Sequence, residues 1–425
     1  MRIGMRYGRG FLDVDIPDEN LAGILTIQHE KPLQDPETSV RKAVESPINS
    51  LPLAQLADGR SSACIIISDI TRPVPNQMIL PPILNTLERQ GIPREKIVIL
   101  VATGIHRPST EEELEEMVGI DILSNYRIVS HLSNEPEAHK YLGLTRNGTP
   151  VHIDKTYLES DVKIVTGLIE PHLMAGYSGG RKAICPGIAS VETMKVMHGP
   201  QILEHPNASV GVLDHNPFHI EATEIALMAG VDFNLSVAID NKRQVTGVFA
   251  GALVESHRAG CEFVEKQVTS TLPYPADLVV VSSAGYPLDT TFYQAIKGSL
   301  TAAEVVKPNG AIMLMAECSQ GIGSKPFTDL ILETQNLDQF IQDIYQPENF
   351  VVDQWQLEEL AKVARKADIF FYTEGIPYEQ QQQLFVQPLG CPKEGIDKVF
   401  AKYGDDAKIA VIPEGPYVLA KVEAR

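Results

Sequence analysis

The stretch DVKIVTGLIEPHLMAGYSGGRKAICPG, residues 161–187, joins a continuous apolar run to a glycine-rich loop that carries a histidine and a lysine. The run at 161–169 is apolar without alternation, which is typical of a strand buried on both faces. Six further runs of this kind are ACIIISDI (63–70), KIVILVATG (96–104), ADLVVVSSAG (276–285), GAIMLMAEC (310–318), DIFFYTEG (368–375) and KIAVIPEG (408–415). Helical patterns separate them, so the sequence predicts an α/β fold with mostly parallel sheets flanked by helices.

The length of the chain, 425 residues, is enough for two or three domains. The segment VTSTLPYPA (268–276) has the Ser, Thr and Pro content of a linker. We therefore expect two α/β domains, 1–270 and 271–411, with the active site in the cleft between them. The last segment, 412–425, is available to pack back on the first domain.

The composition excludes several classes of protein. A net charge of −19 argues against a general nucleic-acid binder, because such binding needs clustered cations. We find no apolar run long enough to span a bilayer and no secretory signal, so we expect a cytoplasmic protein without membrane association. The five cysteines are scattered and form no C-x-x-C motif, which argues against a disulfide framework and against a thiolate zinc site.

Polar residues follow several of the predicted strands. Ligands of parallel α/β folds bind beyond the carboxyl ends of the strands, so these residues are candidates for a site. Each one alone is more typical of a solvated or structural side chain, and the case depends on their shared position at the sheet edge. The candidates in these loops and in the helical patterns next to them are Asp69, Arg72, His106, His172, Lys182, His198, Tyr293, Gln294 and Lys297.

The glycine-rich loop does not fit a phosphate loop. Gly176 and Gly180 are separated by three residues, whereas that motif has four, and Lys182 is followed by Ala183 in place of Ser or Thr. A nicotinamide-dependent dehydrogenase is not supported either, since no G-x-G-x-x-G follows a strand.

Two other classes remain as alternatives. A zinc hydrolase could use the three histidines, but H-E-x-x-H is absent and no acid lies at ligand spacing. A small-anion-binding protein without chemistry could use Arg72 and Lys297. Such a protein would not need two histidines that titrate near neutral pH in the same site.

Five segments carry a resemblance to a known family. SDITRPVP (68–75), ATGIHRPST (102–110), EPHLMAGYSGGRKAICPGIA (170–189), MKVMHG (194–199) and GYPLDTTFYQAIKG (285–298) occur in the order found in the lactate racemase family. The similarity extends over essentially the whole chain, including DQW at 353–355. The family uses a nickel-pincer nucleotide, which is a pyridinium-3,5-bisthiocarboxylic acid mononucleotide built by separate maturation enzymes.

The resemblance implies a role for each matching residue. Lys182 matches the lysine that is bound covalently to the nucleotide, and His198 matches the histidine that ligates nickel. His106 and His172 match the two acid/base histidines. The matches for carboxylate or anion binding are Arg72 and Lys297, and those near cofactor or substrate are Asp69, Tyr293, Gln294 and Trp355. Cys185 follows the cofactor lysine and is treated as a packing residue.

The implied reaction is the interconversion of D- and L-2-hydroxy acids, with lactate as the expected substrate. The α-proton next to a carboxylate is only weakly acidic, so removal of hydride is the easier route to a planar intermediate. Two histidines on opposite faces then suit the proton transfers at neutral pH. The alternatives are another 2-hydroxy acid, such as malate, a longer aliphatic acid or a sugar acid, and the non-catalytic anion-binding protein.

Overall fold

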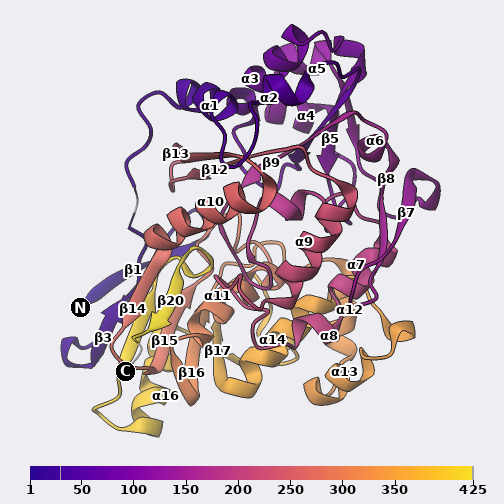
Figure 1. Cartoon of the computed structure of the whole chain (residues 1–425). Coiled ribbons are helices and arrows are strands. Elements are labelled where there is room, and N and C mark those ends of the chain that lie inside the picture. The colour runs from indigo at the N-terminus through magenta and orange to yellow at the C-terminus, as the bar shows by residue number, and fades with distance from the viewer. Residues whose placement is uncertain (29, 424–425) are drawn as a thin grey trace. The chain divides into compact units, whose positions relative to one another are not determined.

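The computed structural model describes residues 1–28 and 30–423. The described chain divides into two compact units. Unit 1 contains residues 1–28, 199–204 and 267–423, and unit 2 contains residues 30–198 and 205–266. Figure 1 gives the labels of the elements in both units.

Unit 2 is built on a six-stranded sheet. Its order is β13 (Val245–Gly251), β12 (Phe233–Ile239), β9 (Val162–Leu168), β4 (Ala63–Ser68), β5 (Ile97–Ala102) and β6 (Arg127–Ser130). All neighbouring pairs are parallel except β12 and β13. A short hairpin of β7 (His139–Leu144) and β8 (Pro150–Asp154) is also present.

Unit 2 contains several helices. They are α1 (Pro36–Glu45), α2 (Leu53–Ala57), α3 (Asn76–Arg89), α4 (Glu111–Val118), α5 (Ile120–Asn125), α6 (Lys155–Leu158), α7 (Val191–Met197), α9 (Pro217–Ala229) and most of α10 (Leu253–Val268). Helices α1, α2 and α3 lie beside one another (Figure 1) and share one core with Ile65 and Ile67 of β4. The alternate residues Cys64 and Ile66 are also fully buried, so the strand is covered on both faces, as its apolar run predicted.

Unit 1 contains a second six-stranded sheet, which is entirely parallel. Its order is β18 (Gln387–Pro388), β17 (Ala367–Tyr372), β16 (Val306–Met315), β15 (Ala276–Ser282), β19 (Ile409–Ile412) and β3 (Leu21–Ile24). Val279 and Val281 of β15 face one core, and Leu278 and Val280 face another. This sheet is therefore also buried on both faces.

The two faces of the unit 1 sheet are covered by different elements. The first core includes α11 (Phe292–Ala303), α12 (Lys325–Glu333), α13 (Leu337–Asp343) and α14 (Gln354–Lys366). The second includes the hairpin of β1 (Arg2–Tyr7) and β2 (Gly10–Asp15) together with α16 (Pro392–Tyr403). The short helices α8 (Pro200–Leu203) and α15 (Tyr378–Gln381) complete the unit.

The fold class predicted from the sequence is confirmed, and each of the seven apolar runs contains all or most of a strand. The stretch 268–276 is not an irregular linker, because β14 (Thr269–Leu272) pairs in parallel with β20 (Leu419–Val422). Residues 1–28, predicted in the first domain, belong to unit 1 together with the segment after residue 411. The predicted location of the active site between two domains stays a prediction.

Among the described residues, no helix has both the length and the apolar stretch needed to cross a bilayer. The longest helix of unit 2, α10, has 16 residues and carries charged side chains.

Helix α14 buries two neighbouring carboxyl groups. Glu358 is 0% exposed, and neither of its carboxylate oxygens has a hydrogen-bond partner among the residues that the structure describes. Burial raises the pKa of Glu358 to about 9, and nearby Lys362 only partly opposes this. Glu359 forms an ion pair of 2.8 Å with Lys362, yet burial still raises its pKa to about 7. Glu358 is therefore protonated at neutral pH.

This burial predicts a stability that falls as the pH rises. Between the ordinary glutamate pKa and about 9, the folded chain binds more protons at Glu358 than the unfolded chain, so the free energy of unfolding decreases with pH. Glu358→Gln cannot ionise and should gain on the order of a few kcal/mol over the parent chain at alkaline pH. Urea unfolding at several pH values measures this, with the exposed Glu333→Gln as control. Equal pH dependence in the parent and Glu358→Gln would contradict the assignment.

Candidate functional site

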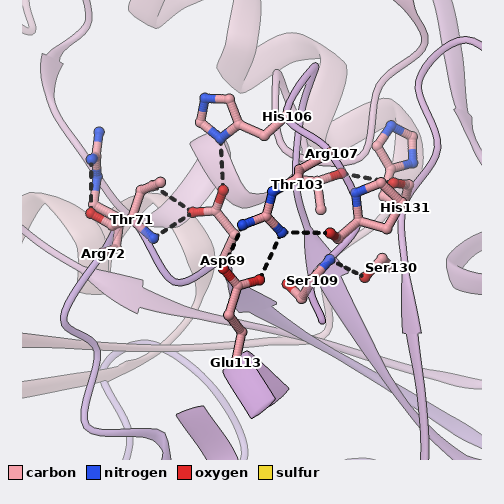
Figure 2. A network of polar contacts seen from close by, with 11 residues as sticks. Asp69, Thr71, Arg72, Thr103, His106, Arg107, Ser109, Glu113, Ser130 and His131 are labelled. Atoms are coloured by element: carbon pink, nitrogen blue, oxygen red, sulfur yellow. Dashed lines mark hydrogen bonds and ion pairs between the residues drawn. The ribbon is translucent and has the colours of Figure 1, made fainter. Parts of the chain in front are cut away.

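The loops that follow β4 and β5 bring Asp69 and His106 together in unit 2. The Nδ1 atom of His106 lies 2.6 Å from Oδ2 of Asp69 (Figure 2). The other carboxylate oxygen, Oδ1, accepts hydrogen bonds from the backbone N–H of Thr71 at 3.2 Å and from its hydroxyl at 2.5 Å. The His106 side chain is 58% exposed, whereas that of Asp69 is only 10% exposed. Asp69 therefore holds the Nδ1–H tautomer of His106 and leaves Nε2 to exchange protons.

Asp69 is ionised at neutral pH. Burial opposes its charge, but the hydrogen bonds from His106 and Thr71 and the cation of Arg72 outweigh burial and lower the pKa of its carboxyl group. The resemblance places Asp69 near cofactor or substrate, and in the structure its direct partner is His106.

Asp69→Asn should therefore impair His106 without removing it. The amide carries no charge, and in one of its two orientations it donates a hydrogen bond to Nδ1 and so favours the wrong tautomer. We expect kcat to fall by roughly 10² or more, because the ring would lose its orientation and its charged partner. Thr71→Ala, which keeps the carboxylate, should lower kcat much less. Steady-state kinetics measure both effects, and a kcat of Asp69→Asn equal to that of the parent would contradict the pairing.

Arg72 connects this loop to the loop that follows β9. Its Nε atom lies 3.2 Å from Oε1 of Glu170, and both side chains are partly exposed. Glu170 stands two residues before His172, so the ion pair links the loop of Arg72 to the loop of the second histidine. Sequence analysis did not select Glu170 as a candidate. Its position directly after a predicted strand was the available signal, as it was for Arg72. The adjacency of β4 and β9 becomes evident only in the sheet order.

The glycine-rich loop folds back so that His172 and Lys182 meet. The short strands β10 (Pro171–His172) and β11 (Gly176–Tyr177) form an antiparallel pair, and a 3₁₀ turn, η4 (Gly180–Ala183), follows. Gly176 has a φ of +76°, and a Cβ there would lie 2.2 Å from the carbonyl oxygen of Val212. The result is a distance of 2.8 Å between Nζ of Lys182 and Nε2 of His172.

The Lys182–His172 contact joins an amine to an imidazole nitrogen. Nδ1 of His172 accepts long hydrogen bonds from the backbone N–H groups of Met174 and Ala175, at 3.4 and 3.3 Å. A lysine ammonium and an imidazole N–H cannot both donate across the same contact, so one of the two groups is unprotonated there. The pair is chemically suited to proton exchange.

His198 lies at the C-cap of α7, close to Lys182. Its Nδ1 donates to the carbonyl of Met194 at 3.1 Å, and its ring packs edge-on against Phe218 with centroids 5.5 Å apart. Lys182 Nζ lies 5.3 Å from the centroid of the same Phe218 ring. Burial, with a smaller effect of Lys182, lowers the pKa of His198 to about 4. His198 is therefore neutral, and since Nδ1 carries the proton, the lone pair of the ring is on Nε2.

The predicted residues of unit 1 come together on α11 and at the start of α14. Trp355 Nε1 donates to the hydroxyl of Tyr293 at 3.0 Å, and that hydroxyl donates to Asp353 at 3.2 Å. Lys297 Nζ donates to Oε1 of Gln294 at 2.6 Å. Burial raises the pKa of Tyr293, which therefore remains a neutral phenol. Asp353 was not singled out by the sequence, although it lies within the DQW segment.

Cys185, three residues after Lys182, is fully buried. Burial raises the pKa of its thiol to about 12, and the nearby cation of Lys182 only partly opposes this. A protonated, enclosed thiol agrees with a packing role.

Comparison with known proteins places these features in a family. Profiles described as the lactate racemase N-terminal domain and the lactate racemase C-terminal domain match residues 7–211 and 272–420. Proteins named lactate racemase from Thermoanaerobacterium thermosaccharolyticum and Lactiplantibacillus plantarum are 34% and 35% identical, with 99% of each chain covered.

Solved structures agree with this result. The lactate racemase apoprotein from Thermoanaerobacterium thermosaccharolyticum has a TM-score of 0.93 at 34% identity, covering 99% of this chain and 100% of that one. A Thermotoga maritima protein shares the fold at a TM-score of 0.67 and 18% identity, covering 93% of this chain and 99% of that one. The resemblance inferred from the sequence segments is confirmed, and the chain belongs to the lactate racemase family.

Proposed function

We propose that this protein is a racemase that interconverts the D and L forms of a 2-hydroxy acid, with lactate as its substrate. The family assignment supports the reaction class. The observation that carries the proposal is the pair of histidines in the loops after β5 and β9, each with a different partner: Asp69 for His106 and Lys182 for His172.

The two histidines would act on the hydroxyl group of the substrate. The proposed racemisation passes through a planar 2-keto acid. One base would therefore take the hydroxyl proton of one enantiomer, and a second base would take the hydroxyl proton of the other enantiomer. His106, exposed and oriented by Asp69, can accept a proton at Nε2 and stabilise the resulting charge. His172, next to the amine of Lys182, would serve the opposite face.

Arg72 would hold the substrate carboxylate. A guanidinium can bind a carboxylate bidentately and keep it in place while the configuration at C2 changes. The ion pair with Glu170 orients Arg72 before substrate binds. Lys297, Gln294, Tyr293 and Trp355 of unit 1 are proposed to hold the cofactor or other anionic groups, as the resemblance implies.

The residues of the chain fit the nickel-pincer nucleotide implied by the family. Among the described residues, no cluster of three or more His, Cys, Asp and Glu side chains is arranged to hold a metal. His198 supplies one neutral imidazole close to Lys182. A single imidazole would suffice for a nickel ion whose other ligands, sulfur and carbon, belong to the nucleotide. When bound, the group would supply an electron-poor carbon that takes up hydride from C2 and returns it.

The chain's own residues would then tether and position this group. Lys182 would form the covalent bond through its amine, and His198 would complete the nickel ligands through Nε2. The glycines of the loop allow close approach of the backbone to a flat ring. Maturation enzymes, which we place in the cytoplasm with the protein, must supply the cofactor.

A chiral assay tests the proposed function. Protein produced together with the maturation enzymes is incubated with single enantiomers of lactate, malate, longer aliphatic 2-hydroxy acids and sugar acids, and the appearance of the opposite enantiomer is measured. We expect lactate to give the highest kcat/KM. A higher value for another acid would change the substrate but not the reaction, whereas no racemisation of any acid by loaded protein would favour the anion-binding alternative.

A further inference from the structure

A small cavity lies behind the glycine-rich turn of unit 2, on the side of Arg181. Its empty space is about 290 Å³, including the solvent at its mouth, and only a small part of this is wide enough for a whole water molecule. That is room for about one water molecule or one monatomic ion. The lining residues are Arg181, Leu213, His219, Thr223, Leu253, Val254, His257 and Arg258.

The wall of this cavity contains a buried positive charge. Arg181 is 1% exposed, and burial lowers the pKa of its guanidinium only to about 10, so it is charged at neutral pH. Its Nη2 donates to the carbonyl of Ala175 at 2.6 Å, and its Nη1 lies 2.8 Å from Nε2 of His257. Within the described part of the chain, Arg181 forms no ion pair with a carboxylate. A buried cation without an opposite charge is costly unless something else compensates it.

Two polar atoms of the lining residues lack partners. Nε of Arg181 and Nδ1 of His219 are buried and have no hydrogen-bond partner among the described residues. Nε of an arginine always carries a proton, and Nδ1 of a neutral histidine can carry one. Each of these atoms can therefore donate a hydrogen bond to an occupant of the cavity that both residues line.

The other charges around the cavity favour an anion over a water molecule. Arg258 adds a second cation, and its partner Asp214, at 2.8 Å, is 73% exposed. The two histidines are neutral. Burial, and next to it the charge of Arg181, lowers the pKa of His219 to about 3, and the same two causes hold the pKa of His257 well below its usual value. The cavity is thus positive, and a water molecule would leave the charge of Arg181 uncompensated.

We propose that this cavity binds a monatomic anion, a halide such as chloride, between Arg181 and His219. A space for about one water-sized occupant fits a monatomic ion better than phosphate, sulfate or a carboxylate. Because Arg181 belongs to the same 3₁₀ turn as Lys182, the ion would stabilise the turn that presents the lysine. The inference depends on the cavity and its charges, and it is independent of the proposed reaction.

Halide-dependent stability of the purified apoprotein tests the inference. At constant ionic strength, replacing gluconate by chloride or bromide should raise the unfolding temperature by about 3 °C or more, with saturation. Arg181→Met should lose the shift, whereas Arg60→Gln, at an exposed arginine, should keep it. Thr223→Asp places a carboxylate in the cavity wall and should abolish the halide shift while keeping the stability in gluconate, which covers the case that Arg181→Met does not fold.

Anomalous scattering from crystals grown in bromide locates the ion directly. A bromide peak within hydrogen-bond distance of Arg181 Nε is expected. A water molecule in the cavity, bromide only on the surface, or an equal halide shift in Thr223→Asp and the parent chain would each overturn the inference.

Discussion

A Lys182→Ala variant is expected to carry no attached cofactor and to show no racemisation above the uncatalysed background. The amine of Lys182 lies 2.8 Å from Nε2 of His172 and close to the Phe218 ring that also contacts His198. No other lysine is predicted to supply the covalent bond. Intact mass under denaturing conditions and a chiral lactate assay, on protein produced with the maturation enzymes, measure both effects.

Lys195→Ala is the matched control for this experiment. Lys195 lies on α7, near the same loop in the sequence, but it is 40% exposed and forms an ion pair with Glu192. We expect this variant to be modified and active like the parent. Full activity of Lys182→Ala, or an unchanged mass addition in it, would show that the tether lies elsewhere.

Removal of either acid/base histidine should cost almost as much activity but leave the cofactor attached. A positioned general acid or base contributes roughly 10² to 10⁴ to a rate, so His106→Ala and His172→Ala should each lose activity on that scale. In the proposed mechanism, one histidine acts as base and the other as acid in each direction, and the two exchange these roles in the opposite direction. Chiral assays that start from pure D- and pure L-lactate measure the loss, and intact mass confirms the attachment.

The two directions must respond together. The enantiomers have equal free energies in water, so a variant has the same kcat/KM for D- and L-lactate. The two histidines differ in their partners, since His106 is paired with ionised Asp69 and His172 with Lys182. Retention of activity within tenfold of the parent by either alanine variant would remove that histidine from the proposed mechanism.

The strands could be predicted from the sequence because they are buried on both faces. In β4 the adjacent residues Cys64 and Ile65, whose side chains face opposite sides of the sheet, are both fully buried. In β15 the adjacent residues Val279 and Val280 contribute to separate cores. Such strands are continuously apolar, so their positions follow from local composition. The same argument singled out Asp69, Arg72, His106 and His172 as candidates, because polar residues after these strands stand out, whereas Trp355 came only from the resemblance.

Contacts between segments distant in the sequence could not be predicted. The Arg72–Glu170 ion pair depends on the adjacency of β4 and β9, which are separated by the strands β5 to β8 in the chain but are neighbours in the sheet. The assignment of the N-terminal hairpin and β3 to unit 1 is also a matter of sheet order, because β3 pairs with β19 near the opposite end of the sequence. Local patterns carry no information on such pairings.

The central claim, that Lys182 is the attachment site of the cofactor, is tested most directly by peptide mapping. The parent protein, produced with the maturation enzymes, is denatured, digested and mapped by mass spectrometry across residues 170–198, and nickel is measured in the intact protein. The account predicts a mass addition on Lys182 and nickel in comparable amount. An unmodified Lys182 in protein from cells with active maturation enzymes would contradict it and leave the anion-binding alternative.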